Sequence, residues 1–219
     1  MKGQLFLTGC IRSGTNWVFD VLAKHYEVCH SEYFDYLDLK RRENAFYGCE
    51  SLLFKINEDM RNLGLLEDAF PDGKIVVILR NPIEALHSIY KPDEESIPFR
   101  PFNDLETKWF KEGDSDRLPA AIRRLLSYFP DDALEKIKSP GPACHILRYE
   151  ELLNDFDATI ANLFAFCGIT VRSGQAIGNR PLRTANQGVR LKNFSAEQQE
   201  IILSSDIPQL SEKMGYAFP

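Results

Sequence analysis

A glycine-containing turn after the first apolar segment constrains the fold of this chain most strongly. Residues 7–17 read LTGCIRSGTNW, and Gly9 and Gly14 have the spacing of the glycines in the phosphate-binding loop G-x-x-x-x-G-K-S/T. In that loop a buried strand leads into a helix, and backbone N–H groups bind phosphate. Thr15 stands where that loop has lysine, and the nearest cation is Arg12. The stretch therefore predicts a strand, an anion-binding loop and a helix, and leaves the anion open.

The rest of the chain alternates strand-like and helix-like patterns without an internal repeat. The predicted strands are Gln4–Thr8, Leu52–Ile56, Lys74–Leu79 and His145–Tyr149, and the predicted helices include Asn16–Tyr26, Asp155–Cys167 and Ser195–Leu203. The strands are apolar without strict alternation, which is typical of strands that helices cover on both faces. We therefore expect a three-layer α/β fold with a mostly parallel central sheet, in a single domain spanning residues 1–219.

Composition and charge exclude several classes of protein. The 219 residues are 44% hydrophobic, enough to fill one large core, and the net charge of -6 disfavours nucleic acid or an anionic membrane surface as the main partner. No apolar segment approaches the roughly 18 residues of a membrane span, and the first strand leaves no room for a signal peptide. The five cysteines form no C-x-x-C pair, which argues against a zinc site. We expect a cytoplasmic protein without stable membrane insertion.

A second motif follows the third predicted strand. Residues 76–88 read VVILRNPIEALHS, so the strand ends at Arg80, Asn81 can cap a helix, and Pro82 suits its first position. Ser88 lies seven residues past the cap, roughly 10 Å along the helix, a distance that an arginine and a bound phosphate can span together. Ligands of open α/β sheets bind beyond such strand ends. Taken alone, the stretch fits equally well a surface arginine and a solvated serine hydroxyl.

The two motifs together argue against a nucleotide-hydrolysing enzyme. In such enzymes an aspartate at the end of a second key strand helps to hold Mg²⁺. Here the equivalent strand ends in Arg80, and the phosphate loop carries Arg12. Two arginines suit a ligand with two separate anionic groups that are neutralised by protein cations, without a metal.

The chain resembles the sulfotransferases that use 3′-phosphoadenosine 5′-phosphosulfate (PAPS). Their 5′-phosphosulfate loop, K/R-x-G-T-T-x, is similar to residues 11–17, and their 3′-phosphate motif, R-x-x-x-x-x-x-x-S, matches residues 80–88. Residues 147–169 look like the family's late strand and helix, and residues 183–194 loosely resemble the region whose arginine closes on the 3′-phosphate. The resemblance implies PAPS as sulfuryl donor, PAP as product, and no metal.

The same resemblance implies a role for each candidate residue that contacts the nucleotide. The 5′-phosphate would lie on the backbone N–H groups of Ser13, Gly14, Thr15 and Asn16, and Arg12 would neutralise charge on the bridging oxygen. Arg80, Ser88 and Arg183 would contact the 3′-phosphate, while Trp17 and Tyr149 would flank the adenine. For the two aromatic residues, packing within the protein core is the alternative.

The catalytic base departs from a common pattern of the family. Many members carry K-T/S-H after the second strand, with the histidine as base, whereas this chain has Lys55-Ile56-Asn57. The resemblance implies a place for Lys55 near the transferred sulfuryl group, but an asparagine does not accept a proton at neutral pH. The leading candidate base is Glu32, in a segment similar to one that holds a glutamate base in some bacterial members. An exposed loop carboxylate is the alternative for Glu32, and His30, Glu58 and Asp59 remain candidates.

The expected function is transfer of a sulfuryl group from PAPS to a hydroxyl, or an amine, of a small-molecule, lipid or glycan acceptor. The sequence identifies neither the acceptor nor the oligomeric state. Two other functions stay open: a small-molecule kinase with a related loop, and a non-catalytic protein that binds PAP or PAPS.

Overall fold

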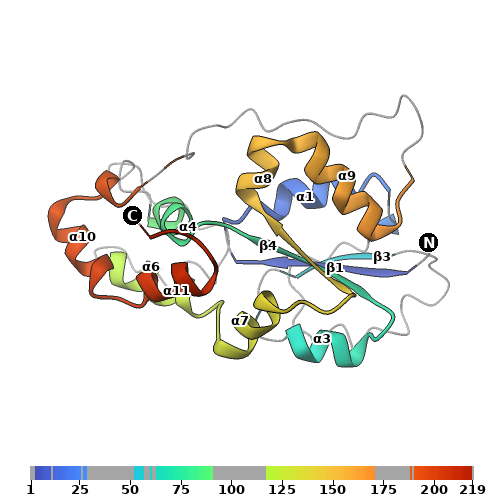
Figure 1. Ribbon diagram of the computed structural model, residues 1–219, viewed down its shortest axis with the longest axis horizontal. Coiled ribbons are helices and arrows are strands. Elements are labelled where there is room, and N and C mark those ends of the chain that lie inside the picture. The colour runs from blue at the N-terminus through green and yellow to red at the C-terminus, as the bar shows by residue number, and fades with distance from the viewer. Residues whose placement is uncertain are drawn as a thin grey trace. The chain divides into compact units, whose positions relative to one another are not determined.

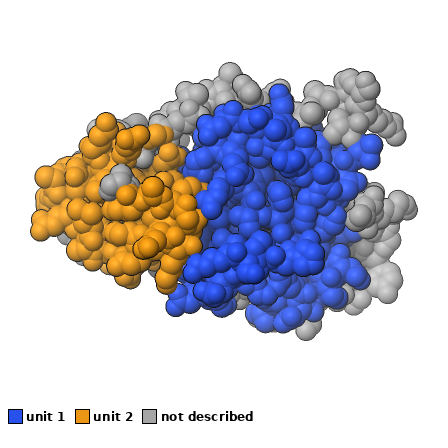
Figure 2. Space-filling view, viewed as in Figure 1, with its two compact units in different colours: residues 1–80, 128–184 blue, residues 81–127, 185–219 orange. Residues whose placement is uncertain are grey.

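The computed structural model describes residues 3–10, 12–25, 27–28, 52–56, 60, 63–90, 117–170, 188 and 190–218. The chain forms two compact units, each built from two segments (Figure 2). The first unit combines residues 1–80 and 128–184, and the second combines residues 81–127 and 185–219. The single domain expected over residues 1–219 stays a prediction.

The first unit contains a five-stranded sheet in the order β2-β3-β1-β4-β5, and every pairing in it is parallel. The strands are β1 (Gln4–Gly9), β2 (Glu27–Val28), β3 (Leu52–Ile56), β4 (Lys74–Leu79) and β5 (Cys144–Arg148). The predicted bounds of β3 and β4 are confirmed, and β1 extends one residue further than predicted. The parallel α/β fold expected from the sequence is therefore confirmed.

Helices cover both faces of this sheet (Figure 1). One face carries α1 (Thr15–Leu22), α8 (Tyr149–Asn154) and α9 (Phe156–Cys167), and the other carries α3 (Leu63–Ala69) and α7 (Asp131–Lys138). Alternate side chains of β1 pack against the helices on opposite faces of the sheet. Leu5 and Leu7 belong to the core beneath α1, α8 and α9, whereas the ring of Phe6 packs against Phe54 and Phe70 on the opposite face.

Two helices of the structure begin at side-chain caps that the sequence contains. The side chain of Asp155 accepts a hydrogen bond from the backbone of α9, and Ser195 forms the predicted capping box with Gln198 at the start of α10 (Ala196–Leu203). The predicted start of β5 and start of the first helix are each one residue too late, and two predicted ends are also wrong. Tyr149 begins helix α8 and does not end β5, and the first helix ends at Leu22, four residues earlier than predicted.

The second unit is helical in the part that the structure describes. It contains α4 (Pro82–Tyr90), α6 (Arg117–Leu126), a short 3₁₀ turn (Leu191–Asn193), α10 (Ala196–Leu203) and α11 (Ile207–Lys213). Asn81 Oδ1 accepts a hydrogen bond from Ile83 N at 2.9 Å, so the predicted cap of α4 is confirmed. None of the described helices has the length and apolarity required to cross a membrane.

The topology of the sheet places β1 between β3 and β4. Because the three strands are parallel, their carboxyl ends lie at one edge, where open α/β sheets bind ligands. At this edge the loop after Gly9 leads into α1, Lys55 lies near the end of β3, and Arg80 follows β4 directly. The sheet thus gathers residues from three of the predicted motifs.

Candidate active site

The loop between β1 and α1 adopts a conformation that depends on Gly14. Its φ is 93°, in the left-handed region, and a Cβ atom at this position would lie 2.5 Å from Cδ2 of Tyr149. The helix then starts at Thr15 with no side-chain cap and no acidic residue in its first turn among the described residues. The positive end of the α1 dipole is therefore arranged to attract an anion.

Arg12 adopts a left-handed backbone conformation in the same loop. Its φ is 65°, which costs a non-glycine residue about 1–2 kcal/mol. The carbonyl oxygen of Arg12 accepts a hydrogen bond from Arg80 Nη1 at 2.8 Å. The two arginines predicted to serve separate anionic groups are therefore in direct contact.

Lys55 reaches the start of α1 from the neighbouring strand. Its side chain is only 4% exposed, and its Nζ donates a hydrogen bond to Oδ1 of Asn16. The same ammonium group lies 5.8 Å from the ring centroid of Phe19. These contacts place the amino group of Lys55 beside the first turn of α1, and its contact with a transferred sulfuryl group stays a prediction.

Arg80 and Ser88 are both buried, each with 5% of its surface exposed. The alternative of a surface arginine and a solvated serine is therefore wrong. The guanidinium carbon of Arg80 lies 4.6 Å from the ring centroid of Tyr149, a cation–π contact within the first unit. Ser88 lies on α4 in the second unit, and a joint contact of Arg80 and Ser88 with one phosphate stays a prediction.

The Trp17 ring is fixed by a residue that the sequence analysis missed. It stacks on Phe156 with a centroid distance of 5.3 Å and an interplanar angle of 9°, and it meets Tyr149 edge-on at 6.2 Å. Phe156 is buried at the first position of α9, where an apolar residue directly after the cap was the only signal. The adenine contacts of Trp17 and Tyr149 stay predictions.

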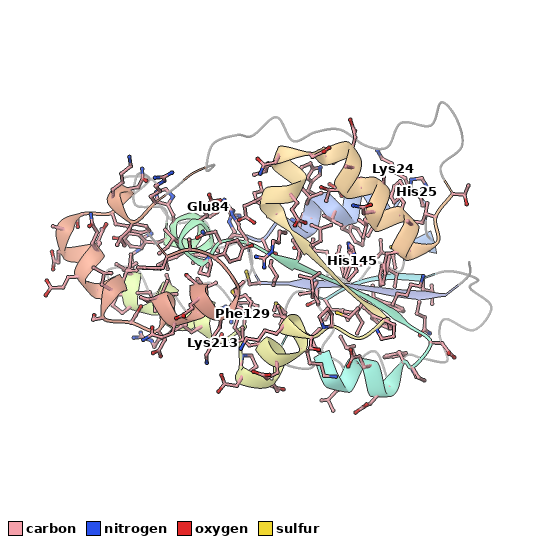
Figure 3. All side chains as sticks on the ribbon, in the orientation of Figure 1. Lys24, His25, Glu84, Phe129, His145 and Lys213 are labelled. Atoms are coloured by element: carbon pink, nitrogen blue, oxygen red, sulfur yellow. The ribbon has the colours of Figure 1, made fainter. Side chains whose placement is uncertain are left out.

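Glu84 is a second residue whose position the sequence analysis did not interpret as functional. It is buried on α4 (labelled in Figure 3), and its Oε1 accepts a hydrogen bond from Gly188 N at 2.9 Å. Tyr90, at the end of the same helix, accepts a hydrogen bond from Gln198 Nε2 at 2.9 Å. These contacts tie the helix that carries Ser88 to the segment that follows the predicted phosphate ligand Arg183.

Several predicted residues lie outside the described residues: Glu32, Arg183, His30, Asn57, Glu58 and Asp59. Within the described part, no group of three or more histidine, cysteine, aspartate or glutamate side chains is placed to hold a metal ion.

Cys10, inside the loop, is buried, and burial raises the pKa of its thiol to about 12. Because a thiol with this pKa stays protonated at neutral pH, Cys10 packs as an apolar residue and is a poor nucleophile.

Comparison with a protein-family model decides the family. The model of the sulfotransferase family matches residues 29–173, more than half of the chain. The chain belongs to the sulfotransferase family. The matched region begins after the phosphate loop, so the similarity of residues 11–17 to the family's loop is an additional observation.

Solved sulfotransferase structures share the fold of this family member. A sulfotransferase domain from the curacin biosynthetic pathway has a TM-score of 0.60 and 14% identity, over 100% of this chain and 99% of that one. Mouse sulfotransferase SULT7A1, complexed with PAP, has a TM-score of 0.58 and 18% identity, over 99% of this chain and 86% of that one. A sulfotransferase from Alicyclobacillus acidocaldarius has a TM-score of 0.54 and 15% identity, over 100% of this chain and 98% of that one. No curated protein matches the sequence significantly.

Proposed function

We propose that this protein transfers the sulfuryl group of PAPS to a hydroxyl group, or an amine, of a small-molecule, lipid or glycan acceptor in the cytoplasm, without a metal ion. The family and the fold support sulfotransferase activity. The observation that carries the choice of donor is that Lys55 and Arg80 contact the first turn of α1 and the loop before it, which contains a third cationic residue, Arg12.

The described residues fit the two anionic ends of PAPS. Gly14 lies so close to the Tyr149 ring that a Cβ atom would overlap it, and at the adjoining helix N-terminus the backbone N–H groups of residues 13–16 would bind the 5′-phosphate. Arg80 would bind the 3′-phosphate, with Ser88 and Arg183 as further ligands. Trp17 and Tyr149 would flank the adenine. The mouse relative complexed with PAP supports this choice of nucleotide.

PAPS, when bound, supplies the sulfuryl group together with a phosphate that leaves. The positive charges of Arg12 and Lys55 would stabilise the bridging oxygen, which keeps the electron pair as its bond to sulfur breaks. Asn16 would hold the Lys55 ammonium in place during this step. On the opposite side of the sulfur, the acceptor oxygen forms the new bond, and its proton passes to a base, for which we propose Glu32.

Binding of PAP in the presence of a chelator is the first test. We expect PAP at 100-fold excess over its dissociation constant to stabilise the fold by about 2.7 kcal/mol, because a ligand that binds only the native state adds this free energy. Thermal melting with PAP, ATP and ADP, each with and without magnesium, measures the effect. A shift with magnesium ATP but none with PAP would contradict the proposal and favour the kinase.

A further inference from the structure

We propose that Arg80 positions the phosphate loop, in addition to the 3′-phosphate contact that its motif predicts. One residue would then act on both anionic ends of the bound nucleotide. This inference deepens the proposed function and rests on it. It is carried by the contacts of Arg80 within the first unit, with Arg12, Tyr149 and, through the tyrosine ring, Gly14.

The first contact supports a backbone conformation that non-glycine residues rarely adopt. Arg12 has a φ of 65°, and its carbonyl oxygen accepts the hydrogen bond from Arg80 Nη1 at 2.8 Å. Arg80 is 5% exposed, so water competes little for this hydrogen bond. The contact connects the residue directly after β4 with the loop after β1, 68 positions away in the sequence.

The second contact covers the loop from the side of helix α8. The Arg80 guanidinium lies on the ring of Tyr149, and the same ring packs so closely on Gly14 that any Cβ there would overlap it. Arg80 therefore holds both the Arg12 carbonyl and the aromatic cover of the loop. A guanidinium has five N–H donors in one plane, and the bond to the Arg12 carbonyl uses one of them.

PAP and AMP distinguish the two roles of Arg80, because these nucleotides differ only in the 3′-phosphate. If Arg80 contacted only the 3′-phosphate, its removal would lower the affinity for PAP and leave the affinity for AMP unchanged. If Arg80 also positions the loop, its removal lowers the affinity for AMP as well. Ser88→Ala is the matched control, since Ser88 belongs to the same motif and has no predicted contact with the loop.

Calorimetric titration of the two nucleotides is the central experiment. For Arg80→Ala we expect AMP affinity to fall about fivefold, because the loop loses its hydrogen bond from the guanidinium, and PAP affinity to fall roughly 50-fold or more, because the contact with the 3′-phosphate is lost as well. For Ser88→Ala we expect PAP affinity to fall about fivefold and AMP affinity to stay within about twofold. Unchanged AMP affinity in Arg80→Ala would overturn the proposal.

Hydrogen–deuterium exchange of the ligand-free protein gives a second readout, which does not depend on any nucleotide. We expect faster exchange of the amides of residues 12–16 in Arg80→Ala and not in Ser88→Ala, with the amides of β4 as the reference for intact folding. Loop exchange equal to wild type in Arg80→Ala would also overturn the proposal.

Arg80→Lys covers the case in which Arg80→Ala fails to fold. Lysine keeps the charge for a phosphate and lacks the planar group that lies on Tyr149. We expect fast loop exchange and weak AMP binding in this variant, with a PAP-to-AMP affinity ratio near that of wild type. Full recovery of loop protection and AMP affinity by lysine would overturn the positioning role. Wild-type protein that binds neither nucleotide would contradict the proposed function, while the exchange experiment still tests the loop contact.

Discussion

Lys55→Met is expected to lower turnover with PAPS by about 10²–10³-fold, the effect of removing one group that stabilises charge developing in a transition state. The side chain is 4% exposed on β3, and its ammonium group is held by Asn16 at the start of α1. Methionine keeps most of the apolar stem and removes the amino group together with its hydrogen bond to Asn16. Steady-state kinetics of PAP release, with the acceptor identified by a panel of hydroxyl compounds, measures the loss in kcat.

Lys74→Met is the matched control for this variant. Lys74 begins β4, and its Nζ donates a hydrogen bond to Phe166 O at the end of the sheet opposite the site. The six residues of β4 span about 20 Å, so Lys74 lies far from the phosphate loop. We expect kcat of Lys74→Met to stay within about twofold of wild type. Equal losses in both lysine variants would argue against a role for Lys55 in the chemical step.

Glu32→Gln is expected to lower kcat by ~10²–10⁴-fold while PAP affinity stays unchanged. Glutamine keeps the shape of the side chain and removes its basicity, so an acceptor hydroxyl loses the group that takes its proton. Comparison of kcat with the PAP dissociation constant separates the chemical step from nucleotide binding.

Asp35→Asn is the control for Glu32, because it removes a carboxylate three residues further along the same segment. Its turnover should stay close to wild type. The base assignment would move to another residue if Glu32→Gln turned over normally while a substitution of His30, Glu58 or Asp59 abolished transfer. The predicted contacts with the nucleotide would be unaffected by that result.

Local patterns in the sequence predict much of the first unit. Leu52–Ile56 and Lys74–Leu79 have their predicted bounds because strands buried on both faces are mostly apolar, and polar residues follow both of these strands at Asn57 and Arg80. The starts of α4, α9 and α10 follow from capping side chains within a few residues of the helix. The strand, loop and helix around Gly14 are also local, since a glycine is required at that φ.

The contacts within the site depend on tertiary packing, and local sequence patterns did not predict them. Lys55 meets Asn16 across 39 positions, and Arg80 meets the carbonyl of Arg12 across 68. No local pattern encodes such a pairing, because it depends on the parallel order of β3, β1 and β4 in the sheet. Tyr149 was assigned to the wrong element for a related reason: α8 follows β5 without an intervening turn residue that would mark the boundary.

Sulfuryl transfer from PAPS in the presence of a metal chelator tests the central claim most directly. Chromatography would follow PAP formation together with a sulfated product across small-molecule, lipid and glycan acceptors. We predict PAP and sulfated product in equal amounts, at a rate that the chelator does not change. Phosphoryl transfer from ATP that requires magnesium, with no turnover of PAPS, would contradict the account, and so would PAP binding without turnover on any acceptor.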